Sequence, residues 1–219
     1  MSKTIFISKS RSELEKLQQY ALENEIEIVS HSFLHFSELI FSIPYPYEVI
    51  FFGSPRAVMF FKAQNDISKD KLVACVGGKT ETLLKSLGVK VAFSGANKGS
   101  IGDVAEAFKT WLGDKQALFP ISTKSLGTIS KNIPSQQKQL VEVYDTQVQP
   151  KTIKPCDIYV FTSPSNVEGF LMENEIPIAS KVIAWGDSTD AKLKAEGLQP
   201  DIVLEEPGLD CLEKTFKTI

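Results

Sequence analysis

The feature that most constrains the fold is an internal repeat. Residues 49–92 and 158–201 align without a gap at a constant offset of 109 positions, with 13 identities among the 44 aligned positions. Each copy reads as strand, Ser-Pro turn, helix, strand, glycine and helix, which predicts two similar α/β halves. Two small domains of this kind favour a ligand site between them. The identical pairs are Phe52 and Phe161, Ser54 and Ser163, Pro55 and Pro164, Val58 and Val167, Phe61 and Phe170, Asn65 and Asn174, Ile67 and Ile176, Val73 and Val182, Gly77 and Gly186, Thr80 and Thr189, Leu84 and Leu193, Lys85 and Lys194, and Gly88 and Gly197.

Composition and charge exclude several classes of function. The 219 residues, 42% hydrophobic and 23% charged, suit a soluble globular protein of two domains. No apolar run is long enough to span a membrane, and the N-terminus lacks a secretion signal, so we expect a cytoplasmic protein. A net charge of −3 gives no basic surface of the kind that binds nucleic acid.

The cysteines and histidines predict neither a disulfide nor a metal site. Cys75, Cys156 and Cys211 are odd in number and widely spaced, as expected of reduced thiols. His31 and His35 would share one face of a helix, but their neighbours alternate like a strand. We therefore expect a protein without a bound metal.

Strand-like and helix-like segments alternate along the chain, which predicts parallel sheets built from βα units. Ten strands are expected, five in each half, with the helices between them in two flavodoxin-like domains. The predicted strands are 4–8, 25–29, 49–52, 72–76, 89–93, 117–120, 140–144, 158–161, 182–185 and 202–204. The predicted helices are 10–24, 55–65, 79–87, 101–112, 122–132, 165–174, 188–196 and 209–217.

The repeat fails as a simple tandem because too few strands precede residue 158 to complete the second half. The N-terminal strand–helix–strand segment resembles the segment 118–144, so it can supply the missing strands. The sequence therefore predicts a split domain, residues 1–31 plus 149–219, and an inserted domain, residues 36–145. The chain must cross between them twice, which predicts a two-stranded hinge with a cleft between the domains.

Hydroxyl or glycine residues follow four predicted strands, where ligands bind in open parallel sheets. Ser54 and Ser163 each open a helix, and Thr80 and Thr189 do the same one unit later. Such hydroxyls, with the free N–H groups of a helix start, can bind an anion. Taken singly, each is better explained as a simple N-cap, and only their coincidence at four strand ends favours a ligand site.

Familiar catalytic motifs are absent from the sequence. There is no GxxxxGK[ST] loop and no GxGxxG fingerprint, and the two histidines support no catalytic triad. Tyr144 ends a predicted strand at the second crossing and could act as an acid toward a leaving hydroxyl. A tyrosine that merely packs the hinge is an equal alternative.

Several ordered motifs resemble the uroporphyrinogen-III synthase family. Phe161-Thr162-Ser163-Pro164-Ser165 is similar to the family's F-T-S-P-S, and Val143-Tyr144-Asp145-Thr146 to its V-Y-x-T. Trp185-Gly186-Asp187-Ser188-Thr189 and a closing Glu-x-Pro at 205–207 follow in the family's order. The resemblance covers nearly the whole chain, including the split-domain layout.

The resemblance implies a cyclising lyase of tetrapyrrole and heme biosynthesis. Linear hydroxymethylbilane, the small-molecule substrate, would lose water and close to uroporphyrinogen III with ring D inverted, without a cofactor. Tyr144 matches the tyrosine thought to help the hydroxyl leave. The positions expected to bind substrate are Ser54, Thr80, Thr162, Ser163, Ser165, Ser188, Thr189 and Lys9.

Three residues depart from the family's pattern. Lys9 stands where an arginine is usual, Gly53 replaces a threonine, and Asp187 replaces a proline beside an expected carboxylate site. The alternative to the enzyme is a non-catalytic two-domain protein that binds another small anion. We expect a monomer, because no long apolar surface stripe is evident.

Overall fold

The computed structural model describes residues 3–206 and 208–218, so Pro207 of the closing Glu-x-Pro motif lies outside the described residues. Contacts divide the chain into two compact units. The split unit comprises Met1–His35 and Gln147–Ile219, and the inserted unit comprises Phe36–Thr146. The chain therefore passes from one unit to the other twice.

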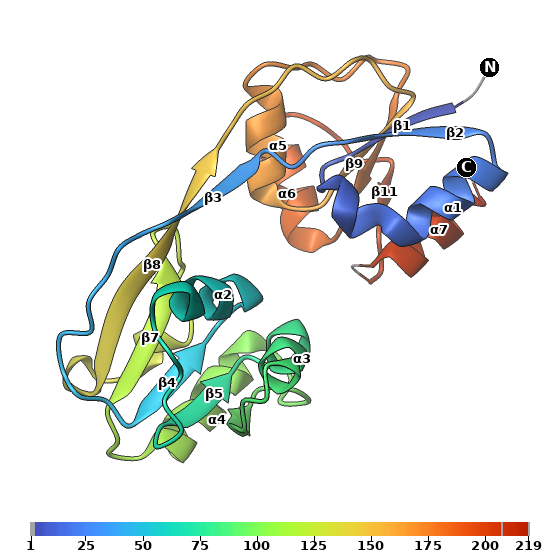
Figure 1. The fold of residues 1–219 in the computed structure, drawn as a ribbon. Coiled ribbons are helices and arrows are strands. Elements are labelled where there is room, and N and C mark those ends of the chain that lie inside the picture. Colours follow the sequence, from blue (N-terminus) through green and yellow to red (C-terminus); the bar gives the residue numbers. More distant parts are fainter. Residues whose placement is uncertain (1–2, 207, 219) are drawn as a thin grey trace. The chain divides into compact units, whose positions relative to one another are not determined.

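The split unit contains a five-stranded parallel sheet of order β11-β10-β9-β1-β2 (Figure 1). The N-terminal strand β1 pairs with two neighbours, so that Ile5 lies opposite Ile28 on one side and Ile158 on the other. Helices α1 and α7 bury one face of the sheet, and α5 and α6 bury the other. The elements are β1 (Lys3–Ile7), the 3₁₀ turn η1 (Arg11–Leu14), α1 (Glu15–Glu23), β2 (Ile26–Ser30), β9 (Ile158–Phe161), α5 (Pro164–Leu171), β10 (Lys181–Ala184), α6 (Asp187–Ala195), β11 (Ile202–Val203) and α7 (Leu209–Phe216).

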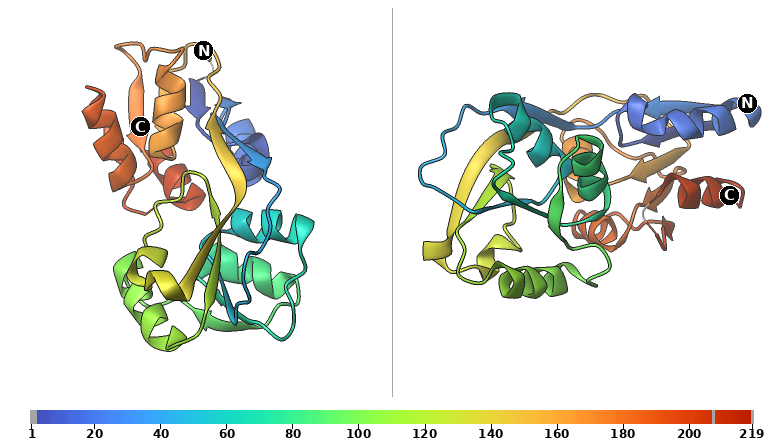
Figure 2. Two further views of the ribbon diagram at one scale, coloured as in Figure 1. Left: turned by 90° about the vertical axis from the view of Figure 1, so that its left-hand side faces the viewer. Right: turned by 60° about the horizontal axis from the view of Figure 1, so that its bottom comes forward.

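The inserted unit contains a six-stranded sheet of order β3-β8-β7-β4-β5-β6. Helices α2 and α3 pack on one face, and α4 packs on the other (Figure 2). The strands β8, β7, β4, β5 and β6 run parallel, so their carboxyl ends share one edge. The elements are β3 (Leu34–Glu38), β4 (Val49–Phe52), α2 (Pro55–Gln64), β5 (Leu72–Cys75), α3 (Gly78–Ser86), β6 (Val91–Ser94), α4 (Ile101–Leu112), β7 (Ala117–Ser122), η2 (Ser130–Asn132), η3 (Ser135–Gln137) and β8 (Lys138–Val148).

Local sequence signals set the helix ends. The Ser54 and Ser163 hydroxyls accept backbone N–H groups at the starts of α2 and α5, where proline occupies the first turn. Gly88 and Gly197 follow α3 and α6 with φ of +72° and +77°, the left-handed conformation that ends a helix. For Ser54 and Ser163, this capping is the alternative that the sequence left open beside an anion site.

Two predictions are wrong. The second sheet has six strands, because residues 34–38 form β3 although the sequence predicted only a crossing segment there. The predicted helix 122–132 does not form, and only the short turns η2 and η3 occupy that connection. The segment is rich in Ser, Thr and Lys, and Gly127 with φ of +63° interrupts it, so no helical apolar stripe exists. No helix in the described part of the chain is long and apolar enough to cross a membrane.

Candidate functional site

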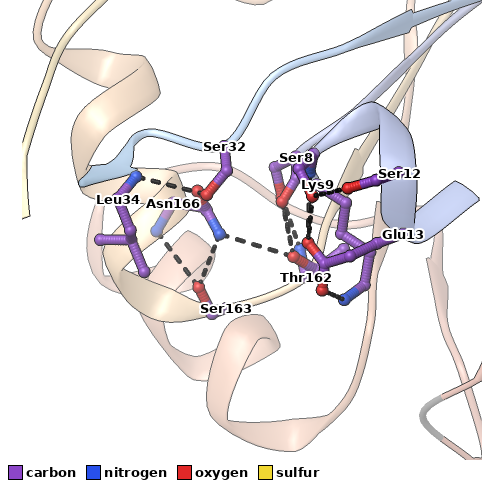
Figure 3. Close-up of polar contacts among 10 residues, drawn as sticks. Ser8, Lys9, Ser12, Glu13, Ser32, Leu34, Thr162, Ser163 and Asn166 are labelled. Atoms are coloured by element: carbon purple, nitrogen blue, oxygen red, sulfur yellow. Dashed lines mark hydrogen bonds and ion pairs between the residues drawn. The ribbon is translucent and has the colours of Figure 1, made fainter. Parts of the chain in front are cut away.

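A network of hydroxyl and amide groups lies at the carboxyl edge of the split unit's sheet (Figure 3). The Thr162 N–H donates to Ser8 Oγ at 2.8 Å, and Thr162 Oγ1 donates to the Ser8 carbonyl at 2.7 Å. The Asn166 side-chain amide donates to Ser163 Oγ at 2.9 Å and lies 3.5 Å from Thr162 Oγ1. The network therefore joins the end of β1 to the start of α5.

Lys9 lies beside this network and is already partly paired. Its Nζ is 3.2 Å from Glu13 Oε1 and 5.5 Å from the centre of the Trp185 ring. Burial raises the pKa of Glu13, but hydrogen bonds from Ser10 and the charge of Lys9 outweigh it and lower that pKa overall. Lys9 is thus held at the sheet edge as a cation with two N–H groups beyond its contact with Glu13.

The other predicted residues of the split unit differ in accessibility. Ser165 lies half-buried in the first turn of α5. Asp187 and Ser188 are exposed in the first turn of α6, whereas Thr189 is only 2% exposed. Ser165 and Ser188 can therefore reach a bound ligand, while Thr189 packs inside the unit. The exposed Asp187 carboxylate occupies the helix start that an anionic ligand would use.

A cavity of about 310 Å³ lies at the carboxyl edge of the inserted unit's sheet. Both Ser54 and Tyr144 line it, and their hydroxyl oxygens are 3.5 Å apart. Ser54 Oγ also accepts the Ala57 N–H at 3.1 Å, which places it at the positive end of α2. The structure thus brings together two predicted residues that are 90 positions apart.

The cavity wall carries no ionisable side chain other than the Tyr144 phenol. Apolar side chains alternate with the hydroxyls of the connection between β7 and β8, which was predicted to be a helix. Sequence reasoning missed these hydroxyls, although the Ser/Thr-rich composition of 122–130 was a signal for an irregular loop. The lining residues are Phe51, Gly53, Ser54, Ala57, Val76, Ile101, Phe119, Pro120, Ile121, Ser122, Ser125, Leu126, Gly127, Thr128, Ile129, Ser130 and Tyr144.

Aromatic contacts fix the ring of Tyr144. Phe60 of α2 stacks on it with ring centres 5.0 Å apart, and Phe36 of β3 meets it edge-on at 6.1 Å. The Arg56 guanidinium lies 3.9 Å from the centre of the Phe36 ring. Tyr144 is only 8% exposed, so its hydroxyl has a narrow range of positions at the cavity wall.

Two further residues, Thr80 and His31, are not among those that line this cavity. Thr80, 2% exposed in the first turn of α3, is not among the lining residues. Burial, reinforced by the charge of Lys151, lowers the pKa of His31, so its imidazole is neutral at neutral pH. Among the described residues, no group of three or more His, Cys, Asp or Glu side chains gathers in a way that could hold a metal ion.

Comparisons with known proteins agree on one family. The family model described as uroporphyrinogen-III synthase HemD matches residues 17–212. The uroporphyrinogen-III synthetase structure from Helicobacter pylori 26695 is 18% identical, with a TM-score of 0.73 and 100% of both chains covered. A mutant uroporphyrinogen III synthase structure from the extremely thermophilic bacterium Thermus thermophilus is 15% identical, with a TM-score of 0.63 and 99% and 98% of the two chains covered.

A search of curated protein sequences gave no significant match. The structural likeness supports the α/β fold with two sheets, and the family model supplies the assignment across most of the chain. The chain belongs to the uroporphyrinogen-III synthase family, the cyclising lyases of tetrapyrrole biosynthesis that convert hydroxymethylbilane to uroporphyrinogen III.

Proposed function

We propose that the cavity of the inserted unit is where hydroxymethylbilane loses its hydroxyl, with Tyr144 as the general acid. The observation that carries this proposal is the Tyr144 hydroxyl, fixed at the wall of a cavity otherwise free of ionisable side chains. A pyrrole ring fits an apolar wall, and the carboxylates of the substrate would remain outside it. A cavity of this size is at the lower end of small-ligand sites, about 300–1,000 Å³.

The chemistry needs one proton at one atom. Tyr144 donates its proton to the leaving hydroxyl as the C–O bond breaks, and the pyrrole nitrogen supplies the electron pair. Water departs, and the substituted carbon of the pyrrole at the other end of the chain attacks the resulting cation to form a spiro intermediate, which fragments and recloses with ring D inverted. The ring proton lost as aromaticity returns passes back to the Tyr144 phenolate. Ser54 and the start of α2 face the phenolate that forms, where a hydroxyl donor and the helix dipole stabilise negative charge.

The split unit would bind carboxylates. Lys9, Ser163, Ser165 and Ser188 are the accessible donors at its sheet edge, and the start of α5 adds its helix dipole, whereas the Asp187 carboxylate occupies the start of α6. Thr162 and Thr189 would support these positions within the split unit, whereas Thr80 lies buried in the inserted unit. Holding several carboxylates at once would bring the two reacting ends together, which supplies much of the rate acceleration in a cyclisation.

The split and inserted domains would act as two jaws on either side of the substrate. The chain passes between the units twice, at 35–36 and 146–147, and two crossings restrict relative rotation more than one does. Closure about these crossings would bring the carboxylate donors of one unit to the tyrosine of the other.

The test uses purified protein and freshly prepared hydroxymethylbilane. The proposal predicts a large excess of the type III isomer, and a roughly 10²-fold or greater loss of kcat in Tyr144→Phe. A Tyr144→Phe variant with full kcat would refute the acid role. A wild-type protein that binds hydroxymethylbilane but yields only the type I isomer would instead be a binding protein.

A further inference from the structure

Asn166 is a buried polar residue of α5 that no family motif quoted above assigns a role. It is 4% exposed, and the structure places both ends of its amide in specific contacts. Its Oδ1 accepts the Phe33 N–H at 2.9 Å, and its Nδ2 donates to Ser163 Oγ at 2.9 Å. Because the Phe33 N–H can only donate, the amide orientation is fixed and Nδ2 must face the hydroxyls.

This orientation determines where each hydroxyl proton of the network lies. Thr162 directs its proton to the Ser8 carbonyl, so the 3.2 Å contact between the two hydroxyl oxygens uses the proton of Ser8. Ser163 Oγ accepts both the Asn166 side-chain amide and the Asn166 backbone N–H, the latter at 3.4 Å. Of these three hydroxyls, whose contacts Figure 3 draws, Ser163 alone retains a proton for a group outside the network.

The repeat supplies an internal comparison. Asn166 corresponds to Ala57 in the first copy, and Ser163 corresponds to Ser54. Ser54 also accepts a backbone N–H from the third residue of its helix, but its second polar neighbour is the Tyr144 hydroxyl at 3.5 Å. That hydroxyl can donate or accept, whereas the Asn166 Nδ2 group that faces Ser163 can only donate. The side-chain amide therefore distinguishes the serine of the split unit from the serine of the inserted unit.

We propose that Asn166 is a positioning residue for substrate binding, which forces the Ser163 hydroxyl to donate to a substrate carboxylate. The proposal rests on the proposed function above, in which Ser163 binds one of the carboxylates of hydroxymethylbilane. Ser163 is half-buried and remains accessible, and the Lys9 cation occupies the same sheet edge. A hydrogen bond donated to a carboxylate is stronger than one between neutral groups.

The decisive variant is Asn166→Asp, which keeps the size of the side chain but reverses one contact. An ionised carboxylate accepts the Ser163 proton instead of donating to Ser163, so the hydroxyl turns away from substrate. We expect KM for hydroxymethylbilane to rise about tenfold with kcat nearly unchanged, because a binding contact is lost. Burial raises the pKa of the introduced carboxyl, and the protonated carboxyl can again donate to Ser163. The ratio of variant to wild-type KM should therefore decrease as the pH is lowered from about 8 to about 6.

Asn174→Asp is the matched control. Asn174 follows the same helix and also ties a loop to it, with Oδ1 accepting the Ile153 N–H at 2.6 Å and Nδ2 donating to the Lys151 carbonyl at 2.8 Å. It lies at the opposite end of α5, so its variant should lose stability without a change in KM. Dividing each variant's KM by the wild-type KM at the same pH removes the titration of His31, of Glu13 and of the substrate, which both proteins share.

The proposal is overturned if Asn166→Asp shows the same KM as Asn174→Asp. It is also overturned if the raised ratio of variant to wild-type KM does not decrease as the pH is lowered. If Asn166→Asp fails to fold, Asn166→Ala replaces it in a double-mutant cycle with Ser163→Ala. Positioning predicts that Asn166→Ala raises KM severalfold alone but not in the Ser163→Ala background, and full additivity refutes it. A wild-type protein that forms no type III isomer would defeat the proposed function itself, a separate outcome.

Discussion

Gly169 of α5 is a position where one added methyl group should have a large effect. A Cβ built there would lie 2.4 Å from Phe33 Cβ and 2.9 Å from Val148 Cγ1. Ordinary carbon contacts are about 3.5–4.0 Å, and Phe33 Cβ cannot move without its backbone. Gly169→Ala must therefore displace the segment whose N–H bonds to Asn166.

The expected cost follows from two opposing terms. Overpacking a buried site destabilises by about 1–3 kcal/mol, and alanine in a helix recovers about 0.5–1 kcal/mol relative to glycine. The net loss is therefore about 0–2.5 kcal/mol, and its midpoint of about 1.3 kcal/mol corresponds to a fall of about 3–5 °C in Tm for a chain of this length. The displaced Phe33 segment would also weaken the Asn166 contact, so KM should rise together with the loss of stability.

Gly102→Ala is the control because it makes the same change in helix α4 at an exposed position. The nearest atom to its added Cβ is Ser100 Oγ at 3.6 Å, an ordinary contact. Only the gain in helix propensity remains, so Tm should stay unchanged or rise slightly. Thermal unfolding of both variants by circular dichroism tests the sign. A Gly169→Ala protein as stable as Gly102→Ala would refute the packing described for α5.

Three further variants and one alkylation reaction test other parts of the structure. Ser54→Ala and Ser163→Ala each remove an N-cap, so each should lower the free energy of unfolding, measured in urea, by about 1 kcal/mol. Ser54→Ala should lower kcat, whereas Ser163→Ala should raise KM. Identical kinetic effects of the two variants would contradict these separate roles. Phe60→Leu removes the ring stacked on Tyr144, so the fold decrease in kcat should exceed the fold change in KM. An unchanged kcat would show that the stacking is dispensable. Burial raises the pKa of Cys156 to about 11, so the reactive thiolate is scarce at neutral pH. Alkylation of Cys156, followed by mass spectrometry, should therefore be much slower in the native protein than in urea. The rate in the native protein should increase as the pH rises.

Local signals in the sequence predicted much of the fold. Ser54-Pro55 and Ser163-Pro164 marked two helix starts, and their side chains cap α2 and α5. The strands 49–52 and 158–161 were predicted with their observed bounds, since both are short apolar runs bounded by turn residues. These features depend on residues that are close together in the sequence, so a single sequence is enough to predict them.

The missed features depend on distant partners. Strand β3 is short and half-exposed, and it is identified only by its place beside β8 in the sheet. The contacts of the site join residues 90 positions apart for Ser54 and Tyr144, and 133 apart for Phe33 and Asn166. Asn166 left one signal, because a polar residue replaces the alanine of the first copy on a buried helix face.

The isomer composition of the product tests the central claim most directly. Freshly prepared hydroxymethylbilane closes on its own to the type I isomer, so only an enzyme that inverts ring D produces type III. We predict that the wild-type protein accelerates substrate loss and yields predominantly uroporphyrinogen III, measured by separating the oxidised products. Formation of the type I isomer alone, at the rate seen without protein, would contradict the account.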